Sequence, residues 1–197
     1  MKVAVISTSP RKNSNSLKVA NYIKDVLAEQ GAKEVEVFSF EEVDIPMLGR
    51  ASLNKANLTP FQKELYTTWN EADLIIFTLP EYNWTLSGEL VNTMHQLGSK
   101  DFAHLFDGKV FAMVGVSAGR GGRTPCLDMI TLTNKLISFL NQYSIVSPKI
   151  FESHDTGINL DQDGRSTGNP VYEKGVKDFV DYTLKVAWKW HGEPCLA

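Results

Sequence analysis

Three apolar runs, each followed by a polar loop and then by a helical pattern, constrain the fold of this chain more than any other feature. The runs cover residues 3–6, 72–79 and 110–116 and contain few polar positions. Strands that are apolar on both faces are typical of the centre of a parallel sheet with helices on both sides. The sequence therefore predicts an α/β fold in which the loops after these strands meet at one edge of the sheet.

Helical spacing of apolar residues separates the runs. We expect helices over residues 17–30, from residue 60 onward, and over residues 90–97, 125–140 and 171–188. Gly31 is a natural helix end, and Thr59 followed by Pro60 is a typical helix start. Residues 34–40 alternate polar and apolar, which predicts a strand at the sheet edge, and residues 144–150 supply a fifth strand.

Composition and charge exclude several classes of function. A length of 197 residues suits one domain over residues 1–197, and a net charge of -3 gives no general attraction to nucleic acid or to an anionic membrane. No apolar stretch approaches the ~20 residues that span a bilayer, so we expect a cytoplasmic protein without membrane contact. Cys126 and Cys195 lie far apart and are expected to be reduced thiols.

The loop after the first strand has the composition of a phosphate site. Hydroxyl, amide and cationic side chains occupy it just before a helix, whose free N–H groups and dipole favour a negative charge. The residues that could hold a phosphate are Ser9, Arg11, Ser14, Asn15 and Ser16. The alternative is an ordinary serine-rich loop that only caps the helix.

Two common phosphate motifs are absent. The chain has no GxxxxGK[ST] motif for a nucleoside triphosphate, and no GxGxxG follows the first strand. Glu41 and Glu42 follow the second strand, where a dinucleotide fold places its ribose-binding acid, but without first-turn glycines they are interpreted as surface charges. A monophosphate such as that of FMN fits better.

Two further loops are expected at the same edge of the sheet. The first carries Pro80, Glu81, Tyr82, Asn83 and Trp84. Its aromatic rings could lie beside a planar ligand, and its amide could bind a polar ring edge, although these rings could also be filler against a helix. The second carries Ser117, Gly119, Gly121 and Gly122, and its glycines allow backbone amides to approach a ligand closely.

These three loops resemble the motifs of the NADPH-dependent FMN reductases, a family that includes quinone, azo-dye and chromate reductases. Residues 9–16 are similar to the phosphate loop S-x-R-x-x-S-x-N, with Ser16 where the family usually has asparagine. Residues 80–84 resemble the PEYN segment that packs along the isoalloxazine ring, and residues 117–123 resemble the glycine-rich loop at its pyrimidine side. The resemblance covers most of the chain.

This resemblance implies a flavodoxin-like doubly wound sheet of five parallel strands in the order 2-1-3-4-5. It also implies an enzyme in which FMN carries electrons from NADPH or NADH to a small-molecule acceptor such as a quinone, free flavin, azo compound or metal oxyanion. No catalytic side chain is expected, because the chemistry belongs to the flavin. A homodimer or homotetramer is implied as well.

Two other functions remain open. The chain could be a non-enzymatic FMN electron carrier, although such carriers tend to be strongly acidic and this chain is not. It could also be a doubly wound domain that binds a different phosphorylated ligand or none.

The remaining features are weaker signals. Residues 152–170 form a long polar stretch, which we interpret as a candidate for contact with another subunit. No metal site is expected, because the spacing of the histidines does not suit a ligand set and the acidic pattern at 161–172 lacks calcium-loop residues. Residues 191–197 are expected to fray.

Overall fold

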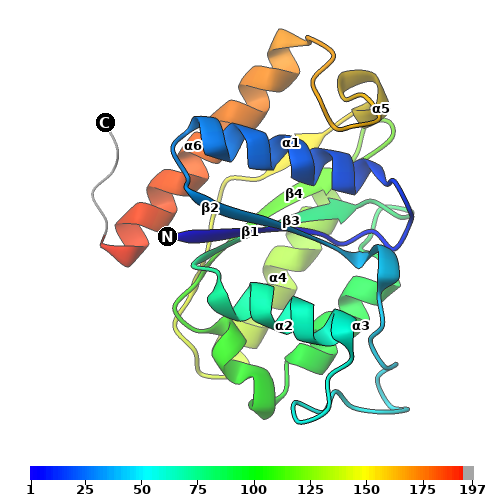
Figure 1. Ribbon diagram of the computed structural model, residues 1–197, viewed down its shortest axis with the longest axis vertical. Helices are drawn as coiled ribbons and strands as arrows, with labels where there is room; N and C mark the ends of the chain where they lie inside the picture. The colour runs from blue at the N-terminus through cyan, green and yellow to red at the C-terminus, as the bar shows by residue number, and fades with distance from the viewer. Residues whose placement is uncertain (193–197) are drawn as a thin grey trace.

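A computed structural model describes residues 1–192 of the chain (Figure 1). Its strands run parallel in the order β2-β1-β3-β4-β5, and a sixth strand, β6, also pairs with β4. The strands are β1 (Lys2–Ser7), β2 (Glu34–Ser39), β3 (Leu74–Pro80), β4 (Val110–Val116), β5 (Ile145–Val146) and β6 (Phe151–Ser153). The fold class and strand order predicted from the sequence are confirmed.

Helices cover both faces of the sheet (Figure 1). They are α1 (Asn15–Glu29), α2 (Pro60–Glu71), α3 (Gly88–Leu97), α4 (Arg123–Phe139), the single turn α5 (Thr156–Asn159) and α6 (Pro170–His191). One apolar core joins α1 and α6 to the first face, and a second core joins α2, α3 and α4 to the other. Short 3₁₀ helices at Phe40–Glu42 and Lys100–Phe106 were not predicted.

Local sequence signals explain where the helices begin. Ser14 caps α1 by accepting a hydrogen bond from the backbone N–H of Leu17, and Thr59 and Gln62 form a reciprocal capping box at α2. β3 and β4 are buried at every position, whereas β2 exposes Glu34 and Glu36 at the sheet edge. The predicted difference between central and edge strands is therefore correct.

The fifth strand differs from its prediction. Residues 144–150 were expected as one strand, but β5 pairs with the first half of β4 and β6 with the second half. Four residues, 147–150, separate the two pieces opposite only two residues of β4. Pro148 in this segment has no N–H to donate to a ladder, which is consistent with the break.

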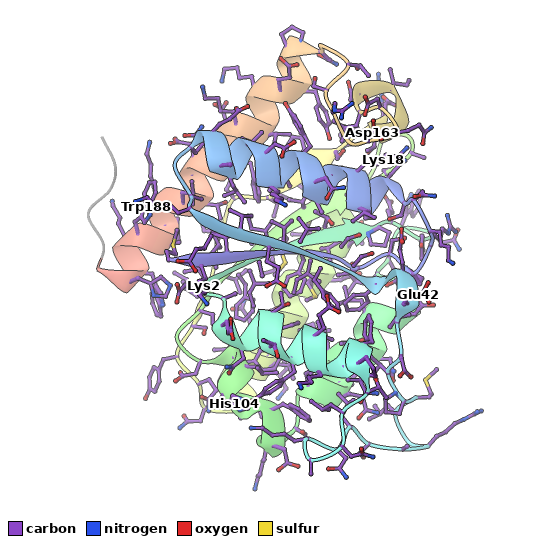
Figure 2. The ribbon with its side chains drawn as sticks, in the orientation of Figure 1. Lys2, Lys18, Glu42, His104, Asp163 and Trp188 are labelled. Atoms are coloured by element: carbon purple, nitrogen blue, oxygen red, sulfur yellow. The ribbon has the colours of Figure 1, made fainter. Side chains whose placement is uncertain are left out.

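The stretch from 152 to 170 is folded onto the rest of the chain rather than extended. Leu160, Thr156 and Ser153 are buried, and the turn at Gly164 lies so close to α1 that a Cβ there would sit 2.7 Å from the backbone oxygen of Lys18. Figure 2 shows Lys18 and Asp163 side by side where this turn meets α1. This segment therefore packs against the first helix.

The end of the last helix differs from its prediction. Residues 191 and 192, expected to fray, end α6: His191 is its last residue and Gly192 its C-cap with positive φ. Residues 193–197, with Cys195, lie outside the described residues.

Cys126 is a free, buried thiol, and burial raises its pKa to about 12. None of the described helices is long and apolar enough to cross a membrane.

Candidate functional site

A cleft of about 290 Å³ opens at the carboxyl edge of the sheet, where β1, β3 and β4 end. Its lining comes from three loops: residues 9 and 11–16, residues 80–82, and residues 116–118. In Figure 1 the strands run from the N-terminus on the left toward this edge on the right. The three loops that the sequence singled out are thus brought together.

The first loop presents buried hydroxyls and free backbone donors to the cleft. Ser9, Ser14 and Ser16 are all buried although all three line the cleft. At the start of α1, the hydroxyl oxygen of Ser14 accepts a hydrogen bond from the backbone N–H of Leu17, and its backbone oxygen accepts one from the backbone N–H of Lys18. Within residues 1–192 the N–H groups of the first two helical residues, at positions 15 and 16, have no acceptor. This end of the cleft therefore presents hydrogen-bond donors of the kind that could hold an anion.

One strand and the start of one helix hold the two ends of this loop in place. The hydroxyl of Thr78 donates to the backbone oxygen of Ser16 at 2.9 Å, and the hydroxyl of Ser87 donates to that of Thr8 at 3.1 Å. All four residues are buried, so these bonds are protected from competing water. The first loop is therefore tied to β3 and to the start of α3.

Glu41 braces the same loop from the side of β2. Its Oε1 accepts a hydrogen bond of 2.6 Å from the backbone N–H of Asn13, a residue with positive φ. Glu42 forms an exposed ion pair with Lys12 at 3.5 Å, and Figure 2 shows it at this edge of the molecule. The sequence analysis interpreted both glutamates as surface charges and missed the hydrogen bond that Glu41 accepts. Only the adjacency of β2 to β1 could have suggested its role.

Tyr82 joins the second loop to the first. Its hydroxyl lies 3.0 Å from the hydroxyl of Ser9, and the guanidinium carbon of Arg11 lies 4.4 Å from the centre of its ring. The backbone N–H of Arg11 also donates to the Ser9 hydroxyl at 3.3 Å. Ser9, Arg11 and Tyr82 are therefore one connected cluster in the wall of the cleft.

The second loop ends in a tight two-residue turn. Tyr82 and Thr85 exchange two backbone hydrogen bonds of 3.0 and 3.1 Å, and the central residues Asn83 and Trp84 both have positive φ, as in a type I′ turn. Positive φ is unfavourable for a bulky residue such as tryptophan. The Trp84 side chain is 77% exposed, which is incompatible with the filler interpretation, and neither central residue lines the cleft.

Glu81 and the third loop close the other side. The carboxylate of Glu81 lies against Gly121, where a Cβ would meet its Oε2 at 1.9 Å, and this Oε2 is buried without a partner in the described structure. A Cβ on Gly115 would lie 1.9 Å from the backbone oxygen of Gly122. Glycine is needed at position 115 because backbone approaches it so closely, whereas the clash at Gly121 is with the end of a side chain that can move.

The segment around β6 anchors this third loop. The backbone N–H of Ser117 donates to the backbone oxygen of Ser153 at 3.0 Å, and that of Asp155 donates to Gly119 at 2.8 Å. The Thr156 hydroxyl also donates to the backbone oxygen of Ser117 at 2.9 Å. Sequence reasoning assigned this segment only to subunit contacts and missed these bonds, because no motif marks them.

The predicted site residues divide into two groups. Nine of them line the cleft: Ser9, Arg11, Ser14, Asn15, Ser16, Pro80, Glu81, Tyr82 and Ser117. The other five, Asn83, Trp84, Gly119, Gly121 and Gly122, belong to the same loops but do not line it. Their predicted contacts with a cofactor remain predictions.

Known proteins resemble the chain in sequence. A family described as "NADPH-dependent FMN reductase" matches residues 1–145. A protein named "Probable NADPH:quinone oxidoreductase 2" from Oryza sativa subsp. japonica is 24% identical over 98% of this chain and 92% of its own length. A protein named "NADPH azoreductase" from Bacillus sp. (strain OY1-2) is 31% identical over 65% of each chain.

Solved structures resemble it in fold. The flavoenzyme NAD(P)H:(acceptor) oxidoreductase FerB from Paracoccus denitrificans has a TM-score of 0.72 at 19% identity, covering 96% of this chain and 98% of that one. An FMN-dependent NADH-azoreductase from Bacillus anthracis str. Ames Ancestor, solved in complex with FMN, has a TM-score of 0.57 at 15% identity, covering 95% and 100%.

Proposed function

We propose, from the premise that this chain belongs to the NADPH-dependent FMN reductase family, that its carboxyl-edge cleft holds FMN and that the electrons pass to a quinone. Membership makes the protein an FMN-dependent oxidoreductase that uses NAD(P)H. The position of the cofactor in this chain and the identity of the acceptor are the proposed parts.

The donor set at the start of α1 is the observation that carries the proposal. A phosphate accepts hydrogen bonds through several oxygens and carries negative charge, so it needs several donors and a cation. The cleft offers the hydroxyls of Ser9, Ser14 and Ser16, the free N–H groups at positions 15 and 16, and the guanidinium of Arg11. These groups fit the phosphate of FMN and would hold it.

The rest of the cleft fits a planar ring. Pro80, Tyr82 and Val116 give it apolar wall, and the carboxylate of Glu81 with the backbone of residues 117–118 gives it polar groups. A volume of about 290 Å³ is small for a cofactor site, so part of an FMN molecule would remain accessible to a second substrate. When bound here, FMN would supply the redox chemistry, which is hydride acceptance from NAD(P)H and electron transfer to the acceptor. The protein's part is to bind, orient and leave one side open.

A quinone is the acceptor that we favour. The rice relative, which matches almost the whole chain, is named as a quinone oxidoreductase. The exposed indole of Trp84 beside the cleft adds a flat apolar surface on which a planar acceptor could lie. An azo compound is the second candidate, since the Bacillus relative is named as an azoreductase. Free flavin and metal oxyanions are further alternatives.

The test is a steady-state assay of protein reconstituted with FMN. We expect a quinone to stimulate oxidation of NADPH or NADH strongly, with the parallel double-reciprocal lines of a two-step mechanism, and an azo dye to do so less. A holoprotein that reacted slowly with NAD(P)H but rapidly with a reductase partner would instead be an electron carrier. Purified protein that bound another phosphorylated ligand and no flavin would contradict the proposal.

We also propose a homodimer or homotetramer. Ile158 is 74% exposed and Val171 is 79% exposed, and both lie in or next to the 152–170 segment suggested as a subunit contact. Ile158→Glu and Val171→Glu should lower the sedimentation coefficient if this surface is covered by another subunit. Phe139→Glu, a change at a 68% exposed residue of α4, is the control. Dissociation by the control alone would move the interface to α4.

A further inference from the structure

The side chain of Tyr82 faces the anion-binding end of the cleft. The sequence pattern associates residues 80–84 with a planar ring, but within residues 1–192 the Tyr82 hydroxyl contacts the hydroxyl of Ser9 and its ring faces the guanidinium of Arg11, both in the first loop. Its hydroxyl and the face of its ring are thus engaged at the same end as Ser14 and the start of α1. This placement distinguishes Tyr82 from its neighbours Asn83 and Trp84, which are exposed and do not line the cleft.

The hydroxyls of Ser9 and Tyr82 have one more proton to donate than their mutual contact uses. Each hydroxyl has one proton to donate and can accept hydrogen bonds, and the Ser9 oxygen already accepts from the backbone N–H of Arg11. The 3.0 Å contact between the two hydroxyls uses one proton, whichever residue donates it. One O–H therefore remains for another partner in the cleft. A phosphate, which only accepts, matches that remaining donor.

The ring of Tyr82 also sets the orientation of Arg11. A guanidinium that stacks on an aromatic face keeps its N–H groups at its edge, where they can bind a phosphate in forked fashion. Within residues 1–192 the guanidinium of Arg11 lies over the Tyr82 ring, and its N–H groups have no hydrogen-bond acceptor. Stacking thus restricts an exposed, flexible side chain while leaving its donors free, which lowers the entropy lost on binding.

The turn beyond Tyr82 makes this support rigid. Two backbone hydrogen bonds close the turn between Tyr82 and Thr85, and the Thr85 hydroxyl donates to Asp128 on α4 at 3.3 Å. The backbone N–H of Glu81 donates to Val116 of β4 at 2.9 Å. The tyrosine therefore stands on backbone that is fixed from two sides.

We propose that Tyr82 is a positioning residue for the cofactor phosphate, which fixes the Ser9 hydroxyl and the Arg11 guanidinium from across the cleft, and does not serve as a stacking surface for the flavin ring. The inference rests on the proposed function, since it presumes that FMN occupies this cleft. It adds the residue that prepares the phosphate site and makes discrimination between FMN and riboflavin depend on the second loop.

The experiment compares two flavins that differ only in the phosphate. Apoprotein is titrated with FMN and with riboflavin, following the quenching of flavin fluorescence, for wild type, Tyr82→Phe and Tyr82→Leu. Tyr82→Phe removes the bond to Ser9 and keeps a ring under Arg11, and should weaken FMN binding roughly two- to tenfold. Tyr82→Leu removes both supports and should weaken it by roughly a further two- to fivefold. Riboflavin affinity should hardly change.

Two controls separate positioning from general damage. Tyr143→Phe makes the same chemical change at a 76% exposed tyrosine that does not line the cleft, and should leave the ratio of FMN to riboflavin affinity unchanged. In the pair Ser9→Ala and Tyr82→Phe, the double variant should bind FMN about as tightly as Ser9→Ala alone, because both changes remove one contact. Melting temperatures of all variants verify that each is folded.

The outcomes are distinct. Equal loss of FMN and riboflavin affinity in Tyr82→Leu would overturn the inference and return Tyr82 to the flavin ring, and unchanged FMN affinity in both variants would overturn it as well. Wild-type apoprotein that bound neither flavin would contradict the proposed function, and the inference would fall with it.

Discussion

The two ends of the cleft are built in opposite ways. At the start of α1, Ser9 and Ser16 are each only 1% exposed, and hydrogen bonds from β3, α3 and Glu41 hold the loop. Beyond the other end, on loop residues that do not line the cleft themselves, the Trp84 side chain is 77% exposed and a Cβ on Gly119 would meet nothing within 4 Å. One end is buried and interlocked, and the other is open to solvent.

This difference suggests how the two tasks of the site are divided. Buried donors that are already in place lose little freedom on binding, so affinity for the cofactor should come from the phosphate end. An open end with a flat aromatic surface imposes little shape, so it should admit acceptors of different sizes. The predictions below test this division.

The largest effect should come from Arg11→Ala. Losing a charge-assisted contact costs about 1.5–3 kcal/mol, which is roughly ten- to hundredfold in FMN affinity, while riboflavin should be little affected. Lys12→Ala removes the same charge from the same loop, but its ammonium pairs with exposed Glu42, so its effect should be much smaller. Titration of each apoprotein measures both. Equal losses of FMN and riboflavin with Arg11→Ala would place the phosphate elsewhere.

Gly115→Ala should lower stability by displacing the third loop at Gly122. The added methyl would lie 1.9 Å from the backbone oxygen of Gly122, and forced repacking of this kind costs about 1–3 kcal/mol of unfolding free energy. Gly119→Ala, in the same loop but with free space at its Cβ, should change stability by less than about 0.5 kcal/mol. Urea denaturation of both variants gives the comparison. Similar stabilities would mean that the loop adapts freely.

Substitutions of Trp84 should have only small effects on stability. An exposed side chain contributes little to the core, so Trp84→Ala should change the unfolding free energy by less than about 0.5 kcal/mol. Trp84→Gly should raise it by about 0.5–1 kcal/mol, because glycine tolerates positive φ at the second central position of this turn. Thermal melts test both changes.

Trp84→Ala should nevertheless change turnover with bulky quinones more than with small ones. The matched variant is Asn83→Ala, which alters the other central residue of the turn without removing apolar surface. If Trp84→Ala lowered the unfolding free energy by the ~3–5 kcal/mol typical of a buried aromatic, Trp84 would be packed against the protein and would not be available to an acceptor.

Much of this architecture follows from the sequence. The apolar runs, the alternating pattern of β2, and the caps at Ser14 and Thr59 depend on residues close together in the chain, so local periodicity and helix-start chemistry predict them. The rule that parallel strands present their following loops at one edge then brings residues 9–16, 80–84 and 117–122 together without further information.

Tertiary structure alone decided how these loops contact one another. Tyr82 meets Ser9 across 73 positions of sequence, and Glu41 reaches Asn13 only because β2 lies next to β1. The division of the fifth strand and the folding of residues 152–170 over the third loop depend likewise on which partner lies opposite. Periodicity fixes which face of an element is buried, but side-chain contacts between loops depend on backbone turns and neighbours that no local pattern encodes.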